Sequence, residues 1–462
     1  MVIRALFLIS FLITGNLNLF SQESSDTIFN DKTPLISGFI RGGFYGDLKE
    51  NGDKPFISSE FADMGIKFEK RSPGGLFAFA DLRFRYGSEF SEPVSYANVR
   101  EAFVEYTVRK ISLSAGKRIV KWGRADFTNP TSRLNSQNYI SRSPDREDMD
   151  LGNILADINW FPSPAINFQA VIAPLYSPSV LIIDPIPLPD YVSIEQLPSI
   201  VTGEELFSYG LKADFHLRGV DFSASWFDGY DPMPGTALDE FIADFSGPSP
   251  LLSATLKMKP YKIRVAGMDF ETSIGRAGLR GEAAWSEPEL SYTENEYVPL
   301  PEIKWVTGLD ASFGNLRITC EYSGKSVLEY TPSPVDPIIG TEPDYSKLME
   351  LIMTPGFDLQ EYMRLQVGAF NRLYNYQLEK NYHSAGLRLE SDLFYGKALP
   401  SLFTMYNFTS RDLLIIPEIK VKPSDGLTIT IGAEIYSGKK NSLYDIVDDF
   451  LTSIYVGLRA DF

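Results

Sequence analysis

The sequence predicts an all-β protein: a transmembrane antiparallel β-barrel of about 18 strands, with 16 to 20 possible, and long extracellular loops. Segments of about ten residues alternate apolar and polar side chains, as strands with one lipid face and one aqueous face must. Very short turns alternate with long polar or proline-rich connections along the chain. No run of about 18 to 20 apolar residues could form a membrane-spanning helix.

The two classes of connection set the expected number of strands. Short turns are expected near residues 109–110, 161–165, 218–220, 275–278, 314–315, 394–397 and 424–426. Long segments are expected at residues 119–150, 174–206, 228–250, 287–302, 324–382 and 437–449, with one short exception at 409–412. A strand on each side of every connection gives about 18, an even number that returns both ends of the chain to the short-turn side.

The last ten residues, 453–462, show the clearest strand pattern. One face is wholly apolar and the chain stops on it, with Ile454, Val456, Leu458, Ala460 and Phe462 in alternate positions. The stretch resembles the C-terminal signal of bacterial outer-membrane β-barrels, with Tyr455, Gly457, Leu458 and Phe462 at matching positions. That resemblance implies recognition by periplasmic chaperones and the barrel-insertion machinery, and a barrel surrounded by outer-membrane lipid.

Residues 1–22 are expected to be a cleaved secretory signal, because Arg4 precedes a short apolar run that polar residues follow. Residues 23–462 contain no linker or repeat, so we expect a single barrel domain in the outer membrane of a diderm bacterium. The net charge of −17 argues against nucleic acid as a partner. Cys320 is the single cysteine, which excludes an internal disulfide.

A basic stretch, residues 116–126, leaves the fifth expected strand and enters the first long loop. It carries Lys117, Arg118, Lys121 and Arg124. In a barrel of this width a long loop that folds inward narrows the lumen, because side chains alone cannot fill it. We therefore expect these cations at a pore constriction, where they would favour anions. The alternative is a solvated rim, in which the loop's own acidic residues compensate them: Asp145, Glu147, Asp148 and Asp150.

Strand parity predicts which charged side chains line the lumen. The basic candidates are Arg41, Arg83, Arg85 and Lys212, with Arg388 further along the chain. Asp214 and several other acidic residues share the same face: Asp63, Asp81, Glu101, Glu105, Asp269, Glu271 and Glu434. The predicted lumen is therefore charged and hydrated, with both signs present.

Residues 116–130 and the last fifty or so residues are similar to porin-like barrels related to the alginate-export channels of bacterial outer membranes. That resemblance implies passive passage of a solute through the lumen, which in the alginate exporters is a polyanion. The mixed lumen charges of this chain do not single out an anion.

The function predicted from these features is passive passage of small hydrophilic or amphipathic solutes through an outer-membrane channel. Catalysis is not expected, because the two histidines, His216 and His383, have no serine motif nearby. Without a Cys/His cluster, neither a metal nor a cofactor is expected.

The alternative to a channel is a cell-surface adhesion or ligand-binding barrel that acts through its long loops. Residues 324–382 are long enough to hold structure, and 358–378 have helix-compatible spacing.

Overall fold

The computed structural model describes residues 33–49, 56–181, 186–203, 206–245, 251–339 and 350–462. The expected signal peptide, residues 1–22, lies outside these ranges. Within them, eighteen antiparallel strands form one closed sheet. The strands are β1 (Leu35–Asp47), β2 (Ile57–Arg71), β3 (Leu76–Glu89), β4 (Glu92–Val108), β5 (Ile111–Arg118), β8 (Asn153–Ser163), β9 (Ile166–Ala173), β11 (Ser208–Leu217), β12 (Val220–Tyr230), β15 (Lys262–Ile274), β16 (Ala277–Pro288), β17 (Glu302–Phe313), β18 (Leu316–Val327), β19 (Asn381–Ser391), β20 (Ala398–Asn407), β21 (Leu413–Ser424), β22 (Leu427–Ser437) and β23 (Ser453–Asp461).

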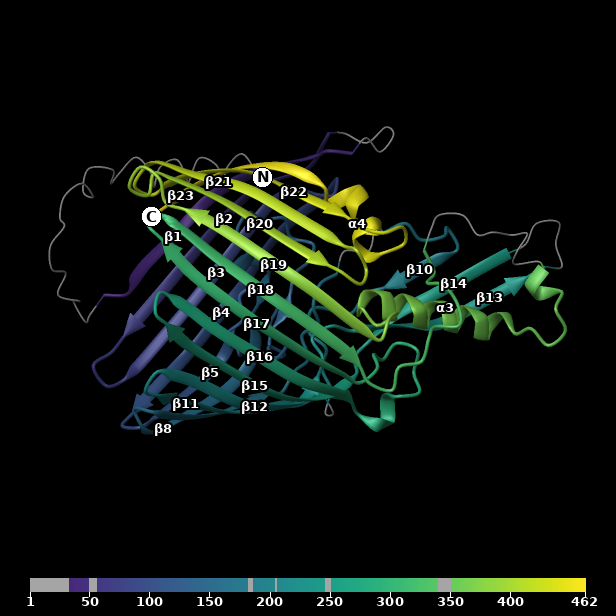
Figure 1. Ribbon diagram of the computed structural model, residues 1–462, viewed down its shortest axis with the longest axis horizontal. Coiled ribbons are helices and arrows are strands. Elements are labelled where there is room, and N and C mark those ends of the chain that lie inside the picture. Colours follow the sequence, from purple (N-terminus) through teal and green to yellow (C-terminus); the bar gives the residue numbers. More distant parts are fainter. Residues whose placement is uncertain (1–32, 50–55, 182–185, 204–205, 246–250, 340–349) are drawn as a thin grey trace, which may run out of the picture.

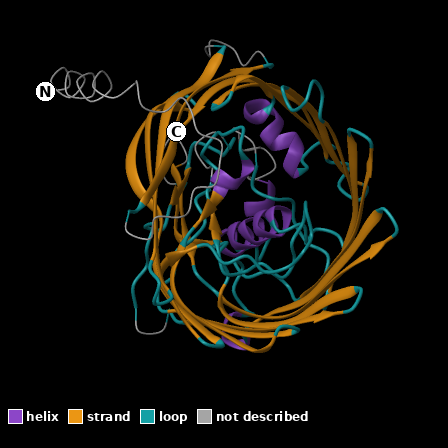
Figure 2. Ribbon diagram, turned by 90° about the vertical axis from the view of Figure 1, so that its left-hand side faces the viewer, coloured by secondary structure: helices purple, strands orange, loops and turns teal. Residues whose placement is uncertain are grey.

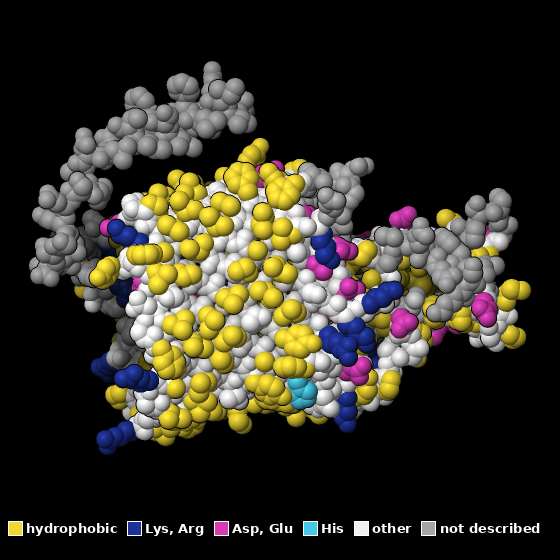
Figure 3. All heavy atoms as spheres, turned by 45° about the horizontal axis from the view of Figure 1, so that its top comes forward, with side chains coloured by type: hydrophobic (Ala, Val, Ile, Leu, Met, Phe, Trp, Pro, Cys, Tyr) yellow, Lys and Arg dark blue, Asp and Glu magenta, His cyan; other side chains and the backbone are white. Residues whose placement is uncertain are grey.

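The barrel closes between its first and last strands. β1 pairs antiparallel with β2 on one side and with β23 on the other, where Gly43 lies opposite Gly457. The apolar faces predicted for these strands point outward: Phe44, Leu458 and Phe462 are all more than half exposed. Apolar side chains of this kind cover the outer wall (Figure 3). A closed sheet leaves no unpaired edge, and this wall matches a hydrocarbon surrounding.

The two ends of the barrel differ as the sequence predicts. Short turns join strands at one end, here called the short-turn end, where β23 also finishes (Figure 1). Long connections gather at the opposite end, the long-loop end. The connection after β12 reaches Lys262 instead of ending at Pro250, because Gly235–Asp244 (β13) and Leu251–Lys259 (β14) pair with each other outside the barrel. Alternation alone cannot distinguish a barrel strand from a strand within a loop.

A small subdomain, here called the cap, stands beyond the long-loop end (Figure 1). It consists of a three-stranded sheet, β10 (Val192–Glu195), β14 and β13, and the helix α3 (Leu359–Tyr374). Its core joins apolar side chains from two long connections: Leu238, Ala254, Leu256, Ile338, Met363 and Val367. The side chain of Asp358 accepts hydrogen bonds from the first turn of α3, which fixes the start of the helix. The helix expected within residues 358–378 is therefore present.

The long loop between β5 and β8, residues 119–152, does not join the cap. It contains the short strands β6 (Ser136–Gln137) and β7 (Asp150–Leu151) and one turn of 3-10 helix, η1 (Arg146–Met149). Its side chains hydrogen-bond to inward-facing residues of the barrel wall, so it lies inside the barrel. We call it the lumen loop. Figure 2 shows loops and helices within the outline of the barrel. A second short helix, α4 (Leu443–Leu451), follows β22 at the long-loop end.

Candidate functional site

The lumen loop crosses the barrel and is attached to two opposite parts of the wall. Residues 123–131 bind β15, β16 and β18, whereas residues 141–148 bind β1, β3, β21 and β23. In the order of the strands around the barrel, these two groups lie about half a turn apart. The loop therefore lies across the interior of the barrel, between these two parts of the wall.

Two buried glutamates hold the first part of the loop. The carboxylate of Glu282 on β16 accepts hydrogen bonds from the backbone N–H of Thr131 at 2.7 Å, from its hydroxyl at 2.8 Å and from the N–H of Arg124 at 3.1 Å. Glu321 on β18 accepts from the N–H of Phe127 at 3.0 Å. Gly123 adopts a φ of +87°, and a Cβ there would lie 2.4 Å from the Glu282 carboxylate. Glycine is thus required for the backbone to approach this closely.

The charge of Arg124 is compensated on the same part of the wall. Its Nε donates to Asp269 on β15 at 2.6 Å, and a terminal nitrogen reaches Glu271 at 3.3 Å. The acidic side chain of Asp126 in the loop pairs in turn with Arg280 on β16 at 2.7 Å. Arg124 lies inside the barrel. Its guanidinium anchors the loop to the wall and is not an open charge.

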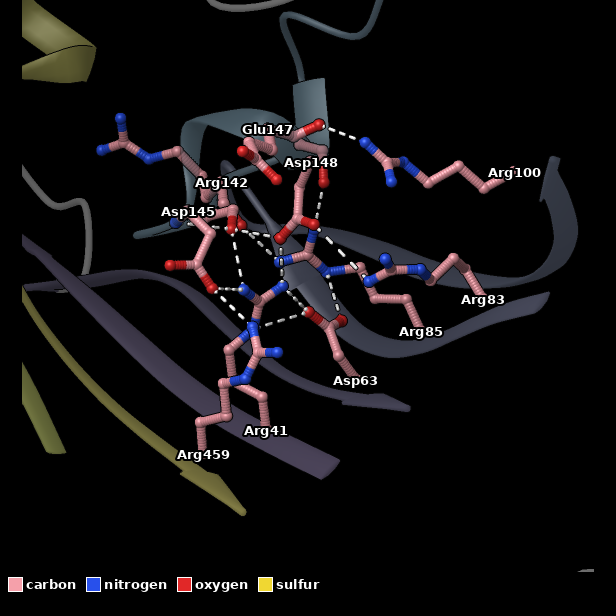
Figure 4. A network of polar contacts seen from close by, with 12 residues as sticks. Arg41, Asp63, Arg83, Arg85, Arg100, Arg142, Asp145, Glu147, Asp148 and Arg459 are labelled. Carbon is pink, nitrogen blue, oxygen red and sulfur yellow. Dashed lines mark hydrogen bonds and ion pairs between the residues drawn. The ribbon is translucent and has the colours of Figure 1, made fainter. Parts of the chain in front are cut away.

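The opposite part of the wall is basic (Figure 4). Arg41 on β1 contacts Asp63 on β2, and it reaches Asp145 and Asp148 of the loop at 3.1 and 2.8 Å. Arg459 on β23 binds Asp145 at 2.8 Å. The loop's acidic residues therefore pair mainly with cations of the wall and not with the basic stretch that precedes them.

Asp145 and Asp148 are ionised by this environment. Burial alone would raise the pKa of Asp145, but Lys420 and Arg41 lower it below its usual range. Burial acts on Asp148 in the same direction, and Arg41 again outweighs it, so the pKa of Asp148 is also lowered. The second attachment of the loop is therefore a set of charge-assisted bonds.

The other lumen candidates also face inward and are paired. Arg83 binds Asp81 and reaches Asp148 at 3.5 Å. The remaining ion pairs have distances between 2.8 and 3.3 Å: Arg85 with Asp63 and Glu89, Lys212 with Asp214, and Arg118 with Asp157 and Glu105. Lys121 pairs with Asp150 of its own loop and is more than half exposed, as the solvated-rim alternative describes.

Lys117 does not face the lumen, and its assignment to the constriction is wrong. On β5 the inward positions are Ser114 and Arg118, whose side chains hydrogen-bond to each other. Lys117 lies between them in the alternation and therefore points outward, opposite Ala102 and Ile154 on the neighbouring strands. The prediction grouped Lys117 with the basic residues of the loop as a candidate for the constriction, but residues 116–118 are the last three of β5 and keep its alternation.

Beside the lumen loop, two arginines carry charge that no carboxylate compensates among the described residues: Arg146 of the loop and Arg388 of β19. Arg146 lies 4.5 Å from the ring centre of Phe403, and Arg388 lies 5.5 Å from the same ring and 4.9 Å from Phe127. The two rings meet edge to face at 5.0 Å. A guanidinium that stacks on a ring keeps its N–H donors available for an anion. Parity placed Arg388 in the lumen, but Arg146 and Phe403 were not identified from the sequence.

Within the described ranges, no group of three or more His, Cys, Asp and Glu side chains could hold a metal ion. No helix in those ranges has the length and apolar character needed to cross a bilayer. His216 pairs with Asp221 at 3.2 Å, and His383 contacts the hydroxyl of Tyr322 at 2.7 Å.

Comparison with solved structures identifies the architecture. No family model matches the sequence, and no curated protein matches it. The crystal structure of Pseudomonas aeruginosa OpdK with vanillate is similar, with a TM-score of 0.54 and 9% identity, over 93% of this chain and 98% of that one. Acinetobacter baumannii OccAB1 gives a TM-score of 0.51 and 9% identity, over 93% and 96%. The chain has the fold of an outer-membrane barrel.

Pseudomonas aeruginosa OccK5 (OpdH) shares the same fold, with a TM-score of 0.50 and 11% identity over 93% of this chain and 97% of that one. A second similar structure is that of OpdK as the outer membrane protein of Pseudomonas aeruginosa. The predicted fold class, a closed antiparallel barrel of 18 strands, is thereby confirmed. At these identities the likeness concerns the fold, and the lumen contacts above are those of this chain.

Proposed function

We propose that this chain is an outer-membrane channel for the passive passage of small hydrophilic or amphipathic solutes. The observation that carries the proposal is the closed barrel itself, whose inner wall carries charged side chains and whose lumen loop is fastened at two opposite parts of that wall. The fold shared with OpdK, which was crystallised with vanillate, supports the same function.

Arg146 and Arg388 are the proposed selectivity residues in place of the basic stretch 117–124. Lumen cations such as Arg41 and Arg124 are already paired with carboxylates, so their fields are largely cancelled. The two stacked guanidiniums are not cancelled in this way. They would favour small anions, since unpaired charges in a constriction set ion preference.

Single-channel recording of the purified protein in planar bilayers tests both statements. We expect a steady conductance with anion preference, and a variant with Arg146→Gln and Arg388→Gln should shift that preference toward cations. At about 1 kcal/mol for each charge in water, the permeability ratio should change by roughly fivefold for each substitution. A matched control, Lys212→Gln with Asp214→Asn, removes an ion pair without changing the net charge and should change selectivity little.

Absence of conductance in the unmodified protein would contradict the channel, whereas equal shifts in both double variants would contradict only the assignment of Arg146 and Arg388. The cap supports a second candidate function, surface adhesion or ligand binding, because it has a core of its own beyond the barrel. A non-conducting protein whose cap variants lose binding to a surface ligand would favour this alternative.

Targeting and assembly complete the proposal. We infer that residues 1–22 are removed, that 23–462 form the mature barrel, and that Tyr455, Gly457, Leu458 and Phe462 are recognised by periplasmic chaperones and the insertion machinery. Leu458 and Phe462 point outward, whereas the Tyr455 hydroxyl donates to Glu418 in the lumen at 2.8 Å. The likeness of residues 116–130 to alginate-export channels remains a prediction. Most lumen cations are already paired with carboxylates, so few of them are available to bind a polyanion.

A further inference from the structure

Three phenylalanines lie together on the lumen side of β3 and β4. Phe77 and Phe79 of β3 alternate with outward residues and share the face of Asp81, and Phe103 of β4 lies opposite Phe79. The ring centres are 6.4 Å apart for Phe77 and Phe79, 6.0 Å for Phe77 and Phe103, and 5.5 Å for Phe79 and Phe103. We call this group the phenylalanine cluster.

The cluster lies close to the short-turn end. Phe77 is the second residue of β3, directly after the turn at residues 72–75. The lumen-loop contacts of β3 are made further along the strand, by Arg83 and Arg85. A solute that enters from the long-loop end therefore meets the cluster after it has passed the lumen loop.

The apolar surface of the cluster is unusual for its position. The interior of a barrel of this class is polar and hydrated, and packing does not require large apolar side chains to fill so wide a lumen. All three rings nevertheless remain partly exposed. An aromatic surface left in contact with water gains free energy when a ring-bearing molecule covers it.

Guanidinium groups lie on both sides of the cluster. Arg71 of β2 stands 4.6 Å from the ring centre of Phe77, and Arg118 of β5 stands 4.7 Å from that of Phe103. Arg118 is paired with Asp157 and Glu105. Arg71 has no carboxylate partner among the described residues, so its charge is available to an anion.

We propose that the phenylalanine cluster and Arg71 form a binding station for flat, ring-bearing anions on the short-turn side of the lumen loop. The rings of Phe77, Phe79 and Phe103 supply the stacking surface, and Arg71 binds the charged group. This inference rests on the proposed channel function and specifies one class of solute that the channel retains. It predicts selectivity for ring shape that Arg146 and Arg388 alone would not produce.

The test compares residence times of benzoate and acetate in single-channel recordings with the solute added at the short-turn end. Phe79→Leu with Phe103→Leu keeps the apolar volume but removes two rings. Because an aromatic pair contributes about 0.5 to 1.5 kcal/mol beyond area burial, the benzoate residence time should fall about three- to tenfold. Acetate should be unaffected. The matched control is Phe84→Leu, which changes a phenylalanine on the outward face of the same strand.

Binding in detergent micelles, measured by saturation-transfer NMR with benzoate, gives a second readout that does not require conductance. Loss of benzoate binding in the double variant, with Phe84→Leu unchanged, supports the station even where conductance fails. Equal benzoate residence and binding in the double variant and the unmodified protein would overturn the station while the channel stands. An equal loss for acetate would also overturn it, because the recognition would not depend on a ring. Absence of conductance alone counts against the proposed function.

Discussion

Glu282 is the residue whose removal most directly tests how the lumen loop is held. Its carboxylate accepts three hydrogen bonds of 3.1 Å or shorter from the loop, two of them from backbone N–H groups. In Glu282→Ala these donors lose their acceptor. A hydrogen bond to a charged group contributes about 1.5 to 3 kcal/mol, but water in the lumen replaces part of that contribution. We expect a loss of about 3 to 5 kcal/mol in the local docking free energy.

Hydrogen exchange measures this loss at the amides concerned. Since 1.4 kcal/mol corresponds to a factor of ten, exchange at the amides of Arg124 and Thr131 should accelerate by about two orders of magnitude or more. Amides of residues 145–149 should change little, because Arg41 and Lys420 still hold that part of the loop. In bilayers, the loosened segment should produce current noise that the unmodified channel lacks.

Glu282→Gln provides the graded comparison, because it keeps one acceptor oxygen and should produce an intermediate effect. Asp214→Asn is the matched control: it removes a lumen carboxylate that pairs with Lys212 on the wall. Exchange at Arg124 and Thr131 that stays within twofold of the unmodified protein in Glu282→Ala would refute the anchoring role. A general acceleration in the barrel strands would instead indicate damage to the fold.

Three further predictions follow from other contacts. Phe462→Asp should reduce the amount of folded barrel in outer membranes far more than one lost apolar contact would, as heat-modifiable migration on gels would reveal; normal levels would contradict its role in insertion. The lowered pKa values of Asp145 and Asp148 mean that their stabilisation is present above their unfolded pKa of about 4 and is lost as the pH falls through the folded values. Protection of amides 145–149 should thus be constant from pH 8 to 5 and fall below about pH 4. In the cap, the amide of Asn371 bonds both the N–H and the carbonyl of Thr236, so Asn371→Ala should increase protease cleavage of the cap and leave the barrel resistant.

The barrel could be predicted from the sequence because each strand carries its own signal. Alternation places Arg41 and Asp214 inside and Leu458 outside, and none of these placements depends on knowing the neighbouring strand. The loop could not be predicted in the same way. Whether Arg124 is an open charge depends on Asp269, which lies more than a hundred residues further along the chain. The basic stretch therefore suggested a ring of free cations, whereas Arg124 is paired and the charges beside the loop without a carboxylate partner, among the described residues, are those of Arg146 and Arg388.

The same limit explains the errors at the boundaries. Lys117 was assigned to the pore constriction because its neighbours are basic, and only the register with Ala102 shows that it occupies an outward position of β5. Strands β13 and β14 alternate as barrel strands do, and their apolar face packs against α3 in the cap. A side-chain period of two reports that one face is buried, but it does not report what covers that face.

The pairing of β1 with β23 has a consequence for the order of folding. Gly43 and Gly457 are partners although almost the whole chain separates them, so the contact that removes the last free edge is also the most distant one in sequence. The entropy cost of bringing two chain segments together grows only slowly with the number of residues between them. Closure of the barrel is therefore delayed mainly because β1 cannot pair until β23 is available. Until then β1 presents an unpaired edge that could join another chain. A recognition sequence placed in β23 would mark the chains that are complete, and only those can close.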